Sequence, residues 1–320
     1  MKYIKLFQET SEYETFKNSV DFILPNVSYA VNAKSVFFTP KIITPPTPSE
    51  PDVPSITAGV GDIAYWSNGS IKTTPLSSWS SSLGTPIGVV VIPKGFAPDG
   101  KVRLIGLKPV DKNGNQSDSH QYLYWETSGS YVDTSLPNYN MVPTTDNAGS
   151  TSTGSDSYGY LPSDKFTGAQ SYVDSEAKYN GSSNLIPSPY LGDAPNPEYY
   201  KTLDGGNILS DFNGLSNTQT LVGLGSDYVA ANAAWKYKDG TSNLQWYLPA
   251  MGELGYLMPR FNLINASLTA VSGVAVVGGS VFWSSSEYSS GGAYCLDTDD
   301  GCVYYNIKDG DFYVRPFCSL

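Results

Sequence analysis

Hydrophobic and polar residues alternate in short runs along most of the chain, and Gly, Pro, Ser, Thr and Asn interrupt these runs every few residues. The runs GDIAYW (61–66), PIGVVVIP (86–93) and KVRLIGLKPV (101–110) are long enough for strands, and the last two are rich enough in β-branched residues to be buried. After residue 57, helical spacing occurs at Val229–Trp235, at Met251–Leu257 and in the stretch FNLINASL. Many short strands with few helices predict an α+β domain.

Residues 1–40 have a pattern of their own. Ser11 and Glu14 have capping-box spacing, which predicts a short helix over Tyr13–Asn18. Three strands are predicted around it, at MKYIKLF, VSYAV and SVFFTP. A unit of this size buries too little apolar surface to be stable alone, so we expect it to pack on a partner as an attachment module.

The remaining organisation follows from composition. Residues 41–57 are rich in proline and lack apolar periodicity, which predicts an extended, stiff linker. Strand-like patterning resumes at residue 58 and continues to 320, so this region is the predicted large domain. Within it, residues 127–185 are rich in Ser, Thr, Gly and Asn and are predicted to form a long insertion.

Charge narrows the possible partners. The net charge is −11, and no cluster of Lys and Arg is visible, so binding to nucleic acid or to an anionic membrane is not expected. The chain has neither an apolar run long enough for a membrane span nor an evident export signal, and we therefore expect no membrane span.

Few residues suggest catalysis, metal binding or a cofactor. The three cysteines, Cys295, Cys302 and Cys318, are too few for a disulfide scaffold; Cys295 and Cys302 could pair, but free thiols are favoured in a reducing cell. The single histidine, His120, has neither zinc-ligand spacing nor triad partners in the pattern. The run DTDDG (297–301) resembles a calcium loop but lacks the downstream glutamate of an EF-hand. We expect no enzyme activity, no metal and no cofactor.

The C-terminal segment has an unusual composition. From Tyr288 to Tyr313 it contains one lysine and no Glu, Gln, Met, Trp, Arg, Pro or His, but many Tyr, Asp, Gly and Ser. Tyr offers contact area at low entropic cost, and Ser, Gly and Asp offer adaptable hydrogen bonds, as in binding paratopes. A tyrosine-rich edge strand with ordinary turns is the alternative interpretation of each residue, but the cluster as a whole favours binding.

An ordered series of motifs carries a family resemblance. WYLPAMGEL (246–254), FNLIN, FWSSSEYSS (282–290), the step at Gly301–Val303 and the terminal VRPF (314–317) resemble the C-type lectin-like domain of Bacteroides and gut-phage proteins. That group overlaps formylglycine-generating-enzyme-like domains and the variable proteins of diversity-generating retroelements. The resemblance covers residues 58–320 and implies a C-type lectin-like fold. The start of the chain is similar to phage structural proteins.

The resemblance also implies how the C-terminal segment is organised. Retroelement mutagenesis at template adenines acts on AAY codons, which can become Tyr, Ser, Asp, Gly, Cys, Phe or Ile but not Lys, Glu, Gln, Met or Trp. The implied fixed residues of this segment are Trp283, Ser284–Glu287, Ala293, Leu296, Val303, Lys308 and Val314–Phe317. The implied varied, ligand-binding residues are Gly291, Gly292, Tyr294, Cys295, Asp297, Asp299, Asp300, Cys302, Tyr304, Tyr305, Asn306, Ile307, Asp309, Asp311, Phe312 and Tyr313.

Other residues are expected to support that surface. Trp246 and Trp283 are predicted core aromatics, Glu253 and Glu287 are predicted to cap or bridge within the core, and Arg315 completes this predicted structural frame. We expect five tyrosine and phenylalanine side chains to point outward together as one aromatic patch: Tyr294, Tyr304, Tyr305, Phe312 and Tyr313.

The function expected from this resemblance is that of a phage virion fibre or receptor-binding protein. Residues 1–40 would attach it to a capsid or tail protein of the virion, and the C-terminal domain would bind a host-surface protein or glycan. Phage fibres similar to this one are usually homotrimers, which adds avidity. The alternative is a bacterial cell-surface adhesin or a formylglycine-generating-enzyme-like relative.

Overall fold

The computed structural model divides the chain into two compact units, Met1–Ser55 and Ile56–Leu320. The structure describes residues 4–6, 27–32, 35–40, 58–119, 121–129, 134–137, 139, 158–161, 163, 208–276, 280–299 and 301–320. The helix predicted over Tyr13–Asn18, the linker 41–57, His120, Asp300 and most of the insertion 127–185 lie outside the described residues.

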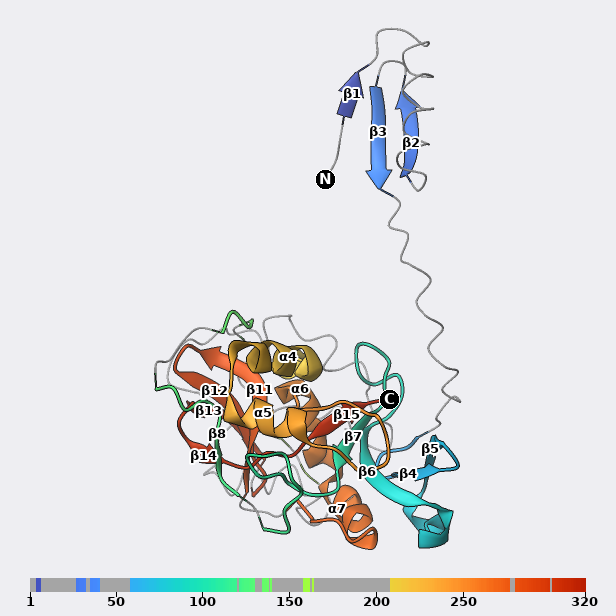
Figure 1. Cartoon of the computed structure of the whole chain (residues 1–320), viewed down its shortest axis with the longest axis vertical. Coiled ribbons are helices and arrows are strands. Elements are labelled where there is room, and N and C mark those ends of the chain that lie inside the picture. Colours follow the sequence, from blue (N-terminus) through green and yellow to red (C-terminus); the bar gives the residue numbers. More distant parts are fainter. Residues whose placement is uncertain are drawn as a thin grey trace. The chain divides into compact units, whose positions relative to one another are not determined.

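The N-terminal unit contains a three-stranded antiparallel sheet in the order β1-β3-β2 (Figure 1). Its strands are β1 (Ile4–Leu6), β2 (Val27–Asn32) and β3 (Ser35–Pro40). The strands β2 and β3 match the predicted segments VSYAV and SVFFTP, whereas β1 covers three residues of the predicted segment MKYIKLF.

The second unit is built around a six-stranded antiparallel sheet in the order β10-β15-β7-β6-β4-β5. In chain order the strands are β4 (Ile63–Ser67), β5 (Ser70–Thr74), β6 (Thr85–Ile92), β7 (Arg103–Gly106), β10 (Trp246–Tyr247) and β15 (Phe317–Ser319). The C-terminal strand β15 pairs with β10 on one side and β7 on the other, so the terminal VRPF motif leads directly into the sheet.

Two smaller antiparallel sheets carry the C-terminal segment. The first has four strands in the order β11-β12-β13-β9, and the second pairs β14 with β8. Their bounds are β8 (Leu123–Tyr124), β9 (Tyr158–Tyr160), β11 (Val281–Ser289), β12 (Gly292–Asp297), β13 (Cys302–Ile307) and β14 (Asp311–Phe312).

The described helices of the second unit are short. Its described α-helices are α4 (Gly214–Leu224), α5 (Val229–Lys236), α6 (Met251–Leu254) and α7 (Phe261–Ala270). The 3-10 helices are η1 (Leu76–Ser78), η2 (Ser81–Leu83), η3 (Ile208–Ser210) and η4 (Gly255–Arg260). The three predicted helices are present, but the α-helix predicted over Met251–Leu257 ends at Leu254 and continues as the 3-10 helix η4, which contains Pro259.

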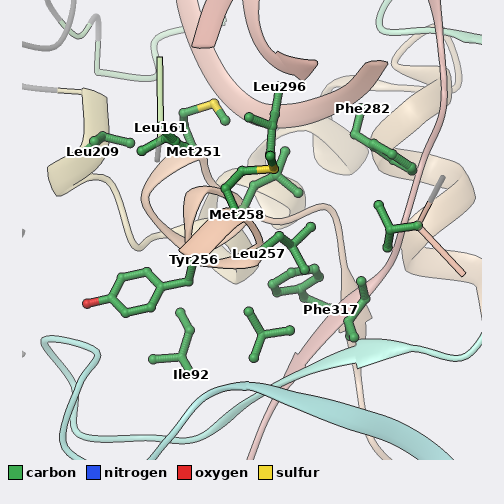
Figure 2. Close-up of a cluster of buried hydrophobic side chains, with 14 of the residues drawn as sticks. Ile92, Leu161, Leu209, Met251, Tyr256, Leu257, Met258, Phe282, Leu296 and Phe317 are labelled. Carbon is green, nitrogen blue, oxygen red and sulfur yellow. The ribbon is translucent and has the colours of Figure 1, made fainter. Parts of the chain in front are cut away.

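Two hydrophobic clusters form the core of this unit. Core A lies between the six-stranded and four-stranded sheets, with α6 and η4 in its centre; Figure 2 shows Ile92 of β6 on one side and Phe282 and Leu296 on the other. Core B contains Trp125, Trp246 and Trp283 together with the buried face of α5. On β6, Val89 belongs to core A and Val90 to core B, so this strand is buried on both faces and its sequence is continuously apolar.

The architecture confirms the α+β class, because the sheets are mostly antiparallel and the helices are few. In the part of the chain that the structure describes, no helix combines the length and apolar character that crossing a membrane requires.

Candidate ligand-binding surface

The WSSSE motif lies on β11, and its serines are buried in hydrogen bonds. The hydroxyl of Ser284 donates to the carbonyl of Tyr294 (2.7 Å), and that of Ser286 donates to the carboxylate of Asp211 (2.6 Å). The Ser285 hydroxyl accepts a hydrogen bond from the side-chain amide of Asn217 on α4 (3.4 Å). The three serine hydroxyls therefore form hydrogen bonds with buried polar groups on neighbouring segments, including Asn217 on α4. This gives the strand a defined position.

The glutamate of the motif forms a buried ion pair. Glu287 and Lys308 are 2.5 Å apart, with side chains 0% and 1% exposed. Glu287 also accepts a hydrogen bond from the hydroxyl of Thr134 (2.7 Å), and the Lys308 ammonium lies 4.8 Å from the ring centroid of Trp125 and 3.7 Å from Glu126. The one lysine of the C-terminal segment is therefore the buried counter-ion of Glu287, which explains why a lysine occurs in a segment otherwise without this residue type.

This ion pair joins three parts of the chain. The backbone carbonyl of Lys308 accepts hydrogen bonds from the amides of Trp125 and Glu126, each 3.0 Å long, and its own amide donates to Gly291 (3.2 Å). Lys308 follows β13 and precedes β14, while Trp125 directly follows β8. The network thus fixes the end of β8, the β13–β14 connection and the β11–β12 turn relative to one another.

A second buried ion pair supports the WYLPAMGEL motif. Glu253 lies 2.6 Å from Arg103 and also accepts hydrogen bonds from the hydroxyl of Tyr247 and the amide of Ala250, each 3.0 Å. Burial raises the pKa of Glu253, and Arg103 opposes that rise. The carboxylate has a bridging role between β7, β10 and α6, and Trp246, which precedes Tyr247 on β10, is fully buried.

Trp283 and Arg315 are likewise fixed by backbone carbonyls. The indole nitrogen of Trp283 donates to Leu123 of β8 (2.8 Å). Arg315 is 1% exposed and donates to the carbonyls of Gly106, Leu107 and Val274 at 2.9, 2.7 and 2.6 Å. Burial lowers the pKa of Arg315 to about 9, so its guanidinium remains charged at neutral pH. All five residues of the predicted frame are therefore buried.

Three of the predicted ligand-binding residues are buried, which corrects the prediction that they face outward. They are Gly292, Tyr294 and Cys295. The strand that carries them, β12, lies between β11 and β13 and has core A on one face and core B on the other. Tyr294 is 0% exposed and donates its hydroxyl to the carbonyl of Tyr139 (2.8 Å), and burial raises its pKa. In this structure these residues are part of the core.

The other twelve described residues of the predicted surface are partly or fully exposed. They are Gly291, Asp297, Asp299, Cys302, Tyr304, Tyr305, Asn306, Ile307, Asp309, Asp311, Phe312 and Tyr313. In contrast, each of the implied fixed residues from Trp283 to Phe317 is buried. Burial thus separates the implied fixed residues from the described implied varied residues, with Gly292, Tyr294 and Cys295 as exceptions.

The expectation that the outward aromatic side chains form one patch is wrong. Tyr304 and Phe312 pack against core B, whereas Tyr305 and Tyr313 pack against core A. Successive residues of a strand point to opposite faces, so adjacent tyrosines cannot share a surface. The ring of Tyr305 instead stacks on Tyr288 with the centroids 3.7 Å apart.

One aromatic surface does form, on the pair of strands β8 and β14. Asp311 lies opposite Tyr124 in the register, and the ring of Tyr122 stacks on Tyr313 at a centroid distance of 4.7 Å. Tyr122 is 62% exposed and Tyr124 is 41% exposed. We call Tyr122, Tyr124, Asp311 and Tyr313 the ribbon surface; they share the face opposite to Leu123 and Phe312.

Sequence reasoning missed Tyr122 and Tyr124. They lie in the run QYLYWE, where tyrosines alternate with an apolar residue, as expected for a strand with one exposed aromatic face. That signal is only two residues long on β8, and nothing in it indicates pairing with a strand almost 190 residues later.

The cysteines and the run DTDDG are the sequence's candidates for reactive or metal-binding side chains. No disulfide joins Cys295, Cys302 or Cys318, and burial raises the pKa of Cys295 well above its ordinary value, so this thiol is a poor nucleophile at neutral pH. In the run DTDDG, the carboxylate of Asp297 accepts the amide of Asp299 (2.8 Å), and Gly301 has a φ of 80°. These are features of a tight turn. Among the described residues, no group of three or more His, Cys, Asp or Glu side chains could hold a metal ion.

Comparison with known proteins yields little. No protein family model and no curated protein matches the sequence. A crystal structure of a fimbrial protein from Bacteroides ovatus ATCC 8483 is similar, with 14% identity and a TM-score of 0.42 over 82% of this chain and 49% of that one. The chain therefore spans about half the length of that protein. A likeness of this size does not bear on function.

Proposed function

We propose that this chain is a phage virion fibre or receptor-binding protein whose C-terminal unit has a C-type lectin-like fold and presents a diversified ligand-binding surface. The observation that carries the proposal is the separation of fixed from varied residues. Every implied fixed residue is buried, and twelve implied varied residues are partly or fully exposed. A retroelement that varies such positions would change the surface while leaving the buried ion pair Glu287–Lys308 intact.

The physical basis for binding is a rigid support with exposed aromatic side chains. Lys308 and its partners fix the connection between β13 and β14, and Trp283 binds the backbone of β8. Preorganised tyrosines lose little conformational entropy when a ligand binds, which is how paratopes obtain affinity. Residues 1–40 would attach the chain to a virion protein, and a homotrimer would multiply weak contacts into avidity.

The gene itself provides a test of diversification. The proposal expects a near-identical repeat next to a reverse-transcriptase gene, differing from this coding sequence at template adenines. The differences should fall on codons of the exposed residues of β13 and β14 and leave Lys308 unchanged. Absence of such a repeat would leave a binding protein with a constant surface.

Location provides the second test. An antibody against the chain, applied in immunoelectron microscopy to phage particles and to bacterial cells from the source population, should label particles. Labelling of cell envelopes alone would overturn the virion assignment in favour of the bacterial adhesin. The full chain should also scatter light as a trimer at micromolar concentration, and a monomer would contradict the expected assembly.

A further inference from the structure

The ribbon surface exposes large aromatic rings without an evident structural need. Among the described aromatic side chains, Tyr122 and Tyr124 are exposed, at 62% and 41%. The ring of Tyr122 stacks on that of Tyr313 with an interplanar angle of 25°, so the two rings lie nearly face to face. Tyr313 in turn packs on Phe282, with the centroids 5.8 Å apart, so Tyr122 is supported by core A through Tyr313. Clustered exposed aromatic side chains mark binding sites.

The charges around these rings are of one sign. Residues 121–126 and 304–313 supply the ribbon surface, and their exposed charged residues are Asp309 and Asp311. The cation in these segments, Lys308, is buried and faces Glu287. None of the ion pairs found among the described residues includes Asp309 or Asp311. Asp311 therefore lies opposite Tyr124 without an ion-pair partner from the described part of the chain, and Asp309 adds a second exposed carboxylate two residues earlier.

We propose that the ribbon surface binds a basic protein segment, with an Arg or Lys side chain lying over the tyrosine rings and paired with Asp311. This inference rests on the proposed function and names the chemistry of its ligand. The face of a tyrosine ring attracts a cation, and a neighbouring carboxylate adds a charge-assisted hydrogen bond. The net charge of −11 would increase the rate of encounter with a basic partner and disfavour an anionic polysaccharide or lipid.

The test uses the full-length chain and defined probes. Fluorescence polarisation would measure binding of an arginine- and glycine-rich peptide, of the same peptide with every arginine replaced by glutamine, and of a neutral oligosaccharide. We expect binding of the arginine peptide alone, weakened by added salt because exposed charges are screened. Tyr124→Ala and Asp311→Asn should each reduce its affinity by about three- to tenfold.

A matched control separates this site from general acidity. Asp299 is exposed and lies in the turn at the opposite end of the β12–β13 hairpin from β14, so Asp299→Asn makes the same charge change away from the ribbon surface. It should leave the affinity unchanged. Equal losses for Asp299→Asn and Asp311→Asn would overturn the proposal by showing a non-specific charge effect. Circular dichroism and thermal unfolding establish that each variant is folded.

The remaining outcomes distinguish this inference from the proposed function. Binding of the neutral oligosaccharide that requires Tyr124 but not Asp311 would overturn the basic partner and leave a glycan-binding protein. No binding of any probe, combined with labelling of virions and attachment of the chain to host cells that survives Tyr124→Ala, would overturn the ribbon site alone. If the antibody does not label virions, or if the chain does not attach to cells, the proposed function itself is rejected.

Discussion

Removal of the Lys308 side-chain charge should destabilise the second unit strongly. In Lys308→Met, Glu287 would stay buried at 0% exposure with the Thr134 hydroxyl as a remaining partner, and Glu126 would lose its ammonium neighbour. Breaking one side of a buried ion pair costs about 3–5 kcal/mol, because the other charge is left uncompensated. A domain's total stability is only about 5–15 kcal/mol, so this variant should lose a large share of it.

Urea unfolding followed by tryptophan fluorescence measures the effect, since Trp125 lies against the lysine. The exposed ion pair of Lys108 with Asp118 is the matched control, with side chains 24% and 82% exposed. Lys108→Met should cost less than about 1 kcal/mol. The double variant Lys308→Met/Glu287→Gln should be more stable than Lys308→Met, because one uncompensated carboxylate is gone. Equal stability of Lys308→Met and Lys108→Met would refute the reasoning.

Three further predictions concern the turn, alkaline pH and the N-terminal unit. Gly301→Ala should lower the free energy of unfolding in urea by about 1–3 kcal/mol, because φ is 80° and the new Cβ would lie 2.4 Å from the carbonyl oxygen of Leu161. Gly95→Ala, where φ is 86° and no atom lies near the new Cβ, should lower it less. Burial raises the pKa of Tyr294 above its ordinary 10.0, so the unfolded chain loses this proton first and the free energy of unfolding should fall as the pH rises above 10.0. In Tyr294→Phe the urea midpoint should fall less steeply with pH. An unchanged slope would contradict the raised pKa of Tyr294. Deleting residues 1–40 should leave the circular dichroism and thermal transition of the second unit intact while abolishing incorporation into virions, and continued incorporation would argue against an attachment module.

The sequence predicted local structure better than packing. The continuous apolar run on β6 and the predicted segments VSYAV and SVFFTP correspond to strands, because strand patterns are set within a few residues. Helix α4 was missed, since its sequence GLSNTQTLVGL has a narrow apolar stripe and its Asn213 makes no side-chain cap. Its stability comes from packing against α5 and β11, which the local pattern does not contain.

The candidate site shows the same limit. The burial of Trp283, Glu287 and Arg315 agrees with the implied frame. The inward position of Tyr294 depends on β12 lying between two strands and two core clusters, and a Tyr-rich strand has the same sequence pattern at an edge or in the centre of a sheet. The ribbon surface depends on pairing between β8 and β14, whose partners are nearly 190 residues apart.

The separation of buried from exposed residues in the C-terminal segment has a consequence for evolution in the laboratory. A library that randomises the exposed residues of β13 and β14, among them Tyr305, Ile307 and Asp311, samples new contacts without altering the hydrogen bonds of Ser284–Ser286. If the buried residues Tyr294 and Cys295 were also randomised, many clones would have an overpacked core or a core with a cavity. The fraction of folded clones, rather than the diversity of the library, then limits how many binders can be recovered, and burial identifies the residues that should stay constant.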